Sequence, residues 1–331
     1  MERRTLGRTG LQVSVLGYGA GAVGGLMTRG EPADQERAVA RALEYGITYF
    51  DTAPQYGDGA SERNLGRVLK TLKPEIVLGT KVRIKPEERS RIGEAVADSL
   101  EASLQRLGRD SVDLFQLHNI IAEDGEPLHL SADVVLNEVV PAFERMRQQG
   151  KTRFIGITAL GDTASLQRVV AARVFDTAQV AYNMLNPSAG APLQPGYPAH
   201  DYASMLSDMQ AAGMGTINIR VLAGGALSGV TTRHPLGSQN VEPIGSAHDY
   251  ATDAQRATRL EALVDEGHAG SLVDAGLRFA IANQAISTVL VGYSTLAQLE
   301  YAAASIAKGP LSAAALARLA ELQSSFVGEA R

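Results

Sequence analysis

The sequence predicts a (β/α)8 barrel preceded by a β-hairpin, with residues 1–331 forming a single domain. Two observations predict this fold. Eight short runs are rich in Val, Ile, Phe and Tyr, and segments with the apolar spacing of amphipathic helices lie between them. Strands that are apolar on both faces and alternate with such helices are typical of a parallel sheet covered by helices. The length alone would favour about two domains, but a barrel accounts for it as one.

The elements follow in order along the chain. Residues 3–17 place two alternating runs around a glycine-containing turn, which predicts the hairpin. The eight predicted strands are 13–19, 47–53, 76–82, 112–118, 153–159, 178–185, 215–222 and 287–293. The predicted helices are 34–45, 61–72, 93–107, 134–149, 163–172, 202–212, 271–282 and 295–306.

The composition excludes several classes of protein. A chain without cysteine has no disulfide, thiolate zinc site, iron–sulfur cluster or cysteine nucleophile. The net charge of -5 argues against nucleic-acid binding, and no apolar stretch of about 18 residues is present to cross a membrane. The N-terminal segment 1–10 lacks the apolar run of a signal peptide, so we expect a soluble, cytoplasmic protein. The histidine spacing predicts no metal site.

A glycine pattern at residues 19–24 matches G-x-G-x-x-G, the dinucleotide-binding fingerprint. The Rossmann mechanism needs a helix that starts at the second glycine and holds the pyrophosphate at its N-terminus. Gly25, Gly30 and Pro32 would break such a helix. We therefore expect the first long helix to start after Pro32, and we reject the Rossmann interpretation.

Polar side chains end several of the predicted strands. In a barrel, functional side chains lie at the carboxyl ends of the strands, and Asp and Lys are almost never fully buried unless they are paired. These ends carry, in chain order, Asp51, Lys81, His118, Thr158, Gln179, Arg220 and Ser294. An Asp, a Lys and a His at the ends of three successive strands predict an active site.

Tyr56 lies five residues after Asp51 and completes this group. A phenol holds its proton too tightly for easy exchange near pH 7, and an adjacent ammonium such as that of Lys81 favours the phenolate. Asp51 would hold the lysine and balance its charge, while His118 would donate a hydrogen bond to the substrate oxygen. These roles are suited to proton transfer coupled to hydride transfer, with Tyr56 as general acid or base.

At this point the chain resembles the aldo-keto reductases over essentially its whole length. The resemblance is carried by FDTAPQYGDGASERNLG (50–66), GTK (79–81), DLFQLH (113–118), TRFIGIT (152–158) and VLVG (289–292). It implies a catalytic tetrad at Asp51, Tyr56, Lys81 and His118.

The resemblance also implies that NAD(P)H binds without a Rossmann fold. The implied cofactor residues are Gly19, Ala20, Gly21, Asp51, Thr158, Gln179, Ile219, Arg220, Leu222, Gly292, Ser294 and Gln298. The resemblance implies contacts from Thr158 and Gln179 to the nicotinamide carboxamide. Thr158-Ala159 replaces the Ser-Asn pair that is common in the family, so one of these contacts departs from the family pattern. Ile219 replaces the ring that usually stacks on the nicotinamide, and Arg220 would reach the pyrophosphate.

In the aldo-keto reductases that the chain resembles, basic residues just after the last strand usually hold the adenosine 2′-phosphate of NADPH. Residues 292–300 contain no Lys or Arg, so the charge-assisted hydrogen bonds that favour NADPH are missing. Ser294 and Gln298 would form hydrogen bonds with either a phosphate or a ribose hydroxyl. The sequence therefore favours dual use or NAD.

The predicted function is an NAD(P)-dependent oxidoreductase that interconverts a carbonyl or hemiacetal with an alcohol or lactone. LGYGAGAVGGL, GITAL and STVLVGYS are similar to the branch that oxidises sugars such as L-galactose or L-fucose to lactones. The alternative is a cofactor-sensing regulatory subunit with little turnover. Substrate specificity is expected in the loops 119–131, 186–200 and 223–251. These loops lie near the predicted mouth and carry His129, His200 and His234, which are interpreted as solvated positions in preference to substrate contacts. The sequence leaves the oligomeric state open.

Overall fold

A computed structural model describes residues 1–230, 232–241 and 249–330, so His248 and part of the 223–251 loop lie outside the described residues. Eight parallel strands close into a barrel in the order β10-β11-β12-β3-β4-β5-β6-β9. Their bounds are β3 Leu16–Gly19, β4 Tyr49–Asp51, β5 Val77–Val82, β6 Val112–Leu117, β9 Thr152–Ala159, β10 Thr177–Ala181, β11 Gly215–Ile219 and β12 Thr288–Gly292. The predicted (β/α)8 barrel is therefore confirmed.

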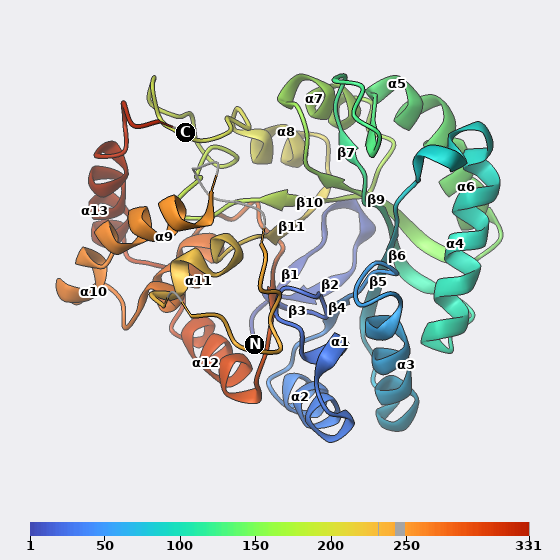
Figure 1. The fold of residues 1–331 in the computed structure, drawn as a ribbon, viewed down its shortest axis with the longest axis horizontal. Coiled ribbons are helices and arrows are strands. Elements are labelled where there is room, and N and C mark those ends of the chain that lie inside the picture. The colour runs from blue at the N-terminus through green and yellow to red at the C-terminus, as the bar shows by residue number, and fades with distance from the viewer. Residues whose placement is uncertain (231, 242–248, 331) are drawn as a thin grey trace.

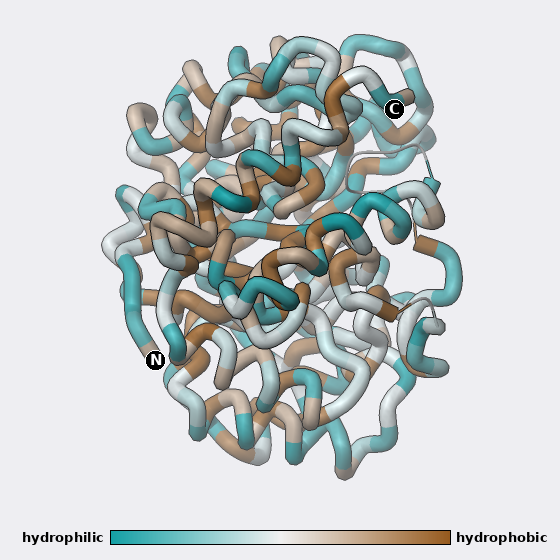
Figure 2. The backbone as a smooth tube through the Cα atoms, turned by 90° about the vertical axis from the view of Figure 1, so that its left-hand side faces the viewer, coloured by the Kyte–Doolittle hydropathy of each residue, from teal (hydrophilic) through white to brown (hydrophobic). Residues whose placement is uncertain are grey.

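Helices surround the barrel (Figure 1). The eight predicted segments correspond to α2 Pro32–Glu44, α3 Ala60–Leu72, α4 Ile92–Leu107, α6 Val140–Gln148, α7 Thr163–Ala171, α8 Met205–Ala211, α11 Leu272–Ala282 and α12 Leu296–Ala307. The predicted helix at 134–149 is composite, because α5 (Ala132–Val134) continues through a π-helical turn into α6. Apolar and polar residues alternate along these helices, as expected for segments that cover a sheet (Figure 2).

Further elements were not predicted from the sequence. They are α1 Leu26–Arg29, α9 Tyr250–Arg259, α10 Ala262–Asp265, α13 Ala313–Ser324, the 3-10 helices Gly7–Thr9, Pro86–Arg91 and Ala223–Ser228, and the short strands β7 Ile120–Ile121 and β8 His129–Leu130. The helix α1 starts within the glycine-rich segment, but it has only four residues, and α2 begins at Pro32 itself. The rejection of the Rossmann interpretation agrees with the closed barrel.

The hairpin pairs β1 (Arg3–Thr5) with β2 (Gln12–Ser14). The predicted strand at 13–19 was wrong as a single unit, since it divides between β2 and β3 at Val15. The amide of Val15 donates to the Glu2 carbonyl of the hairpin, while its carbonyl accepts from Val289 of the barrel. One residue thus joins two sheets, and the chain bends there.

The inside of the barrel has an apolar lower layer and a polar upper layer. Near the amino ends of the strands, the packed side chains are Leu6, Val13, Tyr49, Val77, Leu114 and Ile217. Two residues further along their strands, on the same face, Asp51 follows Tyr49 and Gln116 follows Leu114, both fully buried. The fold therefore directs buried polar groups toward the carboxyl ends of the strands. None of the described helices is long and apolar enough to cross a membrane.

Candidate active site

The structure brings together the four side chains of the predicted tetrad. Asp51 is the last residue of β4, Lys81 lies on β5, and His118 directly follows β6. Tyr56 comes from the loop between β4 and α3. These strands are neighbours in the barrel, so residues distant in sequence meet at one end of it.

The Tyr56 loop turns sharply through Gly57-Asp58-Gly59, whose φ angles of 63°, 51° and 78° are all left-handed. Glycine adopts this conformation at little cost, and Asp is among the few other residues that do so readily. The loop is anchored by Ser61, whose hydroxyl donates to the Ala20 carbonyl at 2.8 Å. This anchor fixes the position of Tyr56 over the barrel.

Asp51 is the acceptor at the centre of the site. Its Oδ1 accepts from the Tyr49 hydroxyl at 2.9 Å, Gln116 Nε2 at 3.1 Å and Gln179 Nε2 at 2.8 Å. Its Oδ2 pairs with Lys81. Burial and the negative charge of Asp51 raise the pKa of Tyr49 well above its ordinary value, so Tyr49 remains a donor. Both carboxylate oxygens of Asp51 therefore accept hydrogen bonds, although the residue is only 1% exposed.

Lys81 is fully buried and uses all three of its ammonium protons. It donates to Asp51, to the Thr52 carbonyl at 2.8 Å and to the Tyr56 hydroxyl at 3.3 Å. Burial by itself lowers the pKa of Lys81, but the attraction to Asp51 and Tyr56 outweighs it and raises the pKa above its ordinary value. The lysine is therefore charged, and its charge acts on the phenol.

His118 faces Tyr56 edge-on, with 5.9 Å between the ring centroids. Its Nδ1 lies 3.5 Å from Gln55 Oε1. Burial and the positive charges of Lys81, Arg83 and Arg220 lower the pKa of His118 well below its ordinary value. A neutral imidazole has one N–H to donate, which fits the predicted hydrogen bond to a substrate oxygen.

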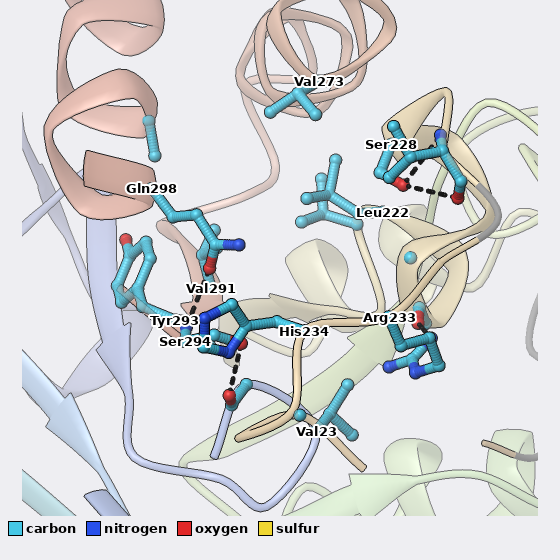
Figure 3. Close-up of a pocket in the computed structure, with 18 of the residues that line it drawn as sticks. Val23, Leu222, Ser228, Arg233, His234, Val273, Val291, Tyr293, Ser294 and Gln298 are labelled. Carbon is cyan, nitrogen blue, oxygen red and sulfur yellow. Dashed lines mark hydrogen bonds between the residues drawn. The ribbon is translucent and has the colours of Figure 1, made fainter. Parts of the chain in front are cut away.

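A cavity of about 510 Å³ opens beside the ends of β11 and β12 (Figure 3). It lies within the size range of ligand sites in proteins. The predicted cofactor residues that line it are Arg220, Leu222, Gly292, Ser294 and Gln298. Arg220 has a φ of 61°, a strained conformation for a residue that is not glycine, and such strain is often found at functional sites.

The other predicted cofactor residues lie between this cavity and the tetrad. Gly19 pairs in register with both Asp51 and Gly292, and Ala20 follows it. A Cβ added at Gly21 would lie 3.6 Å from the Tyr56 ring. On the neighbouring strands, the Thr158 hydroxyl lies 3.5 Å from Gln179 Oε1, and Ile219 ends β11. Through their strand pairings, these residues connect the strands of the tetrad with the strands that line the cavity.

Two polar residues that line the cavity, Ser294 and Gln298, use some of their hydrogen-bonding groups within the protein. The Ser294 hydroxyl donates to the Gly24 carbonyl at 2.6 Å, and the Ser294 amide donates to Gln298 Oε1 at 2.7 Å. Ser294 thus retains an acceptor for a ligand, while Gln298 retains its Nε2 donors.

Sequence reasoning missed Arg233, which lines the cavity together with His234 (Figure 3). His234 is exposed, as expected for a solvated loop position. Arg233 donates to the Gly224 carbonyl at 2.7 Å and lies over the Tyr250 ring. Their loop carried only the signal of unusual length and glycine content, which does not reveal where it folds.

No group of three or more His, Asp or Glu side chains within the described residues is arranged to hold a metal ion. A buried cation that contacts a phenol, beside a cavity in the size range of ligand sites, is suited to proton transfer coupled to hydride transfer.

Comparison with known proteins agrees with this site. Residues 15–324 match the model of the Aldo/keto reductase family. The chain is 31% identical to L-galactose dehydrogenase of Arabidopsis thaliana over 91% of this chain and 86% of that protein. It is also 31% identical to D-threo-aldose 1-dehydrogenase of Pseudomonas sp over 94% and 95% of the two chains. The holo form of aldo-keto reductase AKR11C1 from Bacillus halodurans superposes with a TM-score of 0.70 at 23% identity, covering 100% of this chain and 98% of that one.

The chain belongs to the aldo/keto reductase family. It is accordingly an NAD(P)-dependent oxidoreductase, as the sequence predicted.

Proposed function

We propose that this enzyme oxidises the anomeric carbon of an aldose to a lactone, and that Asp51, Tyr56, Lys81 and His118 carry the reaction. The observation that carries the proposal is the contact of Lys81 Nζ with the Tyr56 hydroxyl, at 3.3 Å, opposite the neutral His118. The aldose dehydrogenase names of the two relatives support a sugar as substrate.

In the proposed reaction, the nicotinamide, when bound, supplies the hydride acceptor for the C1 hydrogen. Tyr56, as the phenolate whose negative charge Lys81 stabilises, takes the proton of the anomeric hydroxyl as general base and becomes a neutral phenol. His118 donates its N–H to the same substrate oxygen and orients it. In the reverse direction Tyr56 returns the proton to the carbonyl oxygen.

The cofactor would bind along the path from Gly19, Ala20, Gly21, Thr158, Gln179 and Ile219 to Arg220, Leu222, Gly292, Ser294 and Gln298. We propose NAD or dual use, because residues 292–300 contain no Lys or Arg and the guanidinium of Arg233 already donates to two backbone carbonyls. Dissociation constants for NADH and NADPH test this part. A preference for NADPH of tenfold or more would contradict it.

The alternative, a regulatory subunit that binds cofactor with little turnover, is less favoured. The relatives at 31% identity carry the names of enzymes, and all four groups needed for turnover face one another. A cytoplasmic location stays a prediction, and cell fractionation would test it.

The experiment that tests the proposed function follows nicotinamide absorbance with a panel of aldoses, including L-galactose and L-fucose, and of simple aldehydes. We expect steady turnover with at least one aldose and formation of the corresponding lactone. Tight cofactor retention without turnover on any compound would support the regulatory subunit instead.

A further inference from the structure

Arg83 lies beside His118 at the carboxyl ends of two neighbouring strands. The parallel register between β5 and β6 pairs Lys81 with Gln116 and Val82 with Leu117, so the next residues along, Arg83 and His118, are level with each other. The His118 amide donates to the Val82 carbonyl at 2.7 Å and continues the pairing. Arg83 therefore occupies the rim directly beside the tetrad.

The direction of the Arg83 side chain follows from its neighbours. Val82 and Ile84 are each 1% exposed and belong to the core that packs between the sheet and the helices. Successive side chains of an extended segment alternate, so Arg83 projects to the opposite side, as Lys81 does. Asn119 fixes this segment, because its Oδ1 accepts from the Ile84 amide and its Nδ2 donates to the Ile84 carbonyl, both at 2.8 Å.

Within the part of the chain that the structure describes, Arg83 makes neither a side-chain hydrogen bond nor an ion pair. Two acidic residues of the adjoining connections are engaged elsewhere: Glu88, after β5, accepts from the Lys85 amide at 2.8 Å, and Glu123, after β6, accepts from the Ala132 amide at 3.0 Å. Arg83 is half-buried, and its positive charge contributes to lowering the pKa of His118. In a chain of net charge -5, an uncompensated guanidinium at this position is unlike the many surface arginines that pair with acids.

The cavity proposed to hold the nucleotide phosphates lies across the barrel from Arg83, so phosphates bound there would not account for this arginine. The cavity is lined by the ends of β11 and β12. In the closed order, β5 stands four strands from β11 in either direction, directly across the barrel. Arg83 thus faces the substrate side of the tetrad and not the cofactor side.

We propose that Arg83 determines specificity by binding an anionic group, a phosphate or a carboxylate, on the same substrate whose reacting carbon lies between Tyr56 and His118. A planar guanidinium binds either anion through two parallel hydrogen bonds. This inference rests on the proposed function and narrows it: the substrate becomes a sugar that carries an acidic group, and short anionic aldehydes are probes of the same contact.

The test compares three aldehydes of similar size as substrates for reduction: glyceraldehyde, glyceraldehyde 3-phosphate and succinic semialdehyde. We expect kcat/KM for at least one of the two anions to exceed that for glyceraldehyde by tenfold or more. The anion that benefits distinguishes a phosphate from a carboxylate. In Arg83→Gln, the loss for that anion should be at least tenfold greater than the loss for glyceraldehyde, and it should lie mainly in KM.

Arg3→Gln is the matched control, because it removes the same charge from an exposed arginine of the hairpin at the other end of the barrel. It should leave the preference unchanged, which separates a local contact from a change in overall charge. Equal kcat/KM for the neutral and both anionic aldehydes, or an equal loss for all three in Arg83→Gln, would overturn the inference while leaving the proposed function intact.

A second measurement does not depend on turnover. Calorimetry of the cofactor-loaded protein with glycerol 3-phosphate, succinate and glycerol should show binding of at least one anion that is tenfold tighter than binding of glycerol and is lost in Arg83→Gln. Such binding without turnover of any aldose or aldehyde would support the role of Arg83 and contradict the proposed function. Turnover of an aldose to its lactone without any anion binding would support the proposed function and overturn the role of Arg83.

Discussion

The ammonium of Lys81 lies between the Asp51 carboxylate and the Tyr56 hydroxyl, 3.3 Å from the latter. The carboxylate holds the lysine in place, and the lysine presents its charge to the phenol. Because both charged groups are buried, their interaction is screened far less than it would be at the surface. The arrangement concentrates the effect of the ion pair on one oxygen atom, that of Tyr56.

Removal of that oxygen is the most direct test of its role. Tyr56→Phe should lower kcat at least about 100-fold, the lower end of what general acid–base catalysis contributes. Cofactor affinity should stay within about threefold of that of the unmodified protein, because the ring is retained. Turnover measured by nicotinamide absorbance and cofactor titration by fluorescence provide the two readouts. Retention of full activity would exclude Tyr56 as the proton carrier.

The buried ion pair makes a prediction about stability. Lys81→Met leaves the carboxylate of Asp51 buried without its countercharge, which should cost about 3–5 kcal/mol of unfolding free energy. The double variant Lys81→Met, Asp51→Asn removes the charge as well and keeps an oxygen that accepts from Tyr49 and the two glutamines. It should be more stable than the single variant. Denaturant unfolding of the three proteins compares them, and a double variant less stable than Lys81→Met would refute this account.

The sequence predicted Asp51, Lys81 and His118 because they lie at the ends of strands whose positions follow from apolar periodicity, and Tyr56 because it follows Asp51 in the adjoining loop. It did not predict that Tyr49 and Gln116 would hold Asp51, because that contact depends on strand register and barrel closure, which no local pattern encodes. The division of one predicted strand at Val15 has the same origin, since the two hydrogen-bond partners of Val15 come from distant segments.

The loops limited the prediction in a different way. Arg233 was not singled out, and the structure brings it to the cavity, because the conformation of a long loop depends on contacts made at a distance. Arg233 reaches the Gly224 carbonyl, and the Ser238 amide donates to the Val23 carbonyl at 3.1 Å. Such contacts between segments far apart in sequence have no counterpart in composition or periodicity.

Tyr18 and Tyr49 form a matched pair for measuring the hydrogen bond to Asp51. Both are buried on neighbouring strands, but only Tyr49 donates to a carboxylate, whereas the Tyr18 hydroxyl has no hydrogen-bond partner within the described residues. Tyr49→Phe should destabilise the protein by about 1–3 kcal/mol, because it removes a bond to a charged group. Tyr18→Phe should be neutral or stabilising, since it removes a buried hydroxyl that is not satisfied. Thermal unfolding of both variants provides the comparison, and equal losses would show that the Asp51 contact contributes nothing specific.

The lowered pKa of His118 predicts how stability depends on pH. Burial, together with the charges of Lys81, Arg83 and Arg220, keeps His118 neutral in the folded protein, while an unfolded histidine takes up a proton near pH 6.5. Above that pH neither state is protonated and the full stability is present. As the pH falls below it toward the folded pKa, only the unfolded state binds the proton, so unfolding becomes easier by on the order of 1 kcal/mol per pH unit.

His118→Asn removes this titration and keeps a polar side chain, so it serves as the reference. The free energy of unfolding of the unmodified protein should fall more steeply between pH 7 and pH 5 than that of His118→Asn, and the two should run parallel above pH 7. Urea unfolding at a series of pH values measures the difference. Curves that stay parallel down to pH 5 would mean that His118 takes up its proton equally well in the folded state, and the neutral donor assigned to it in the reaction would then be wrong.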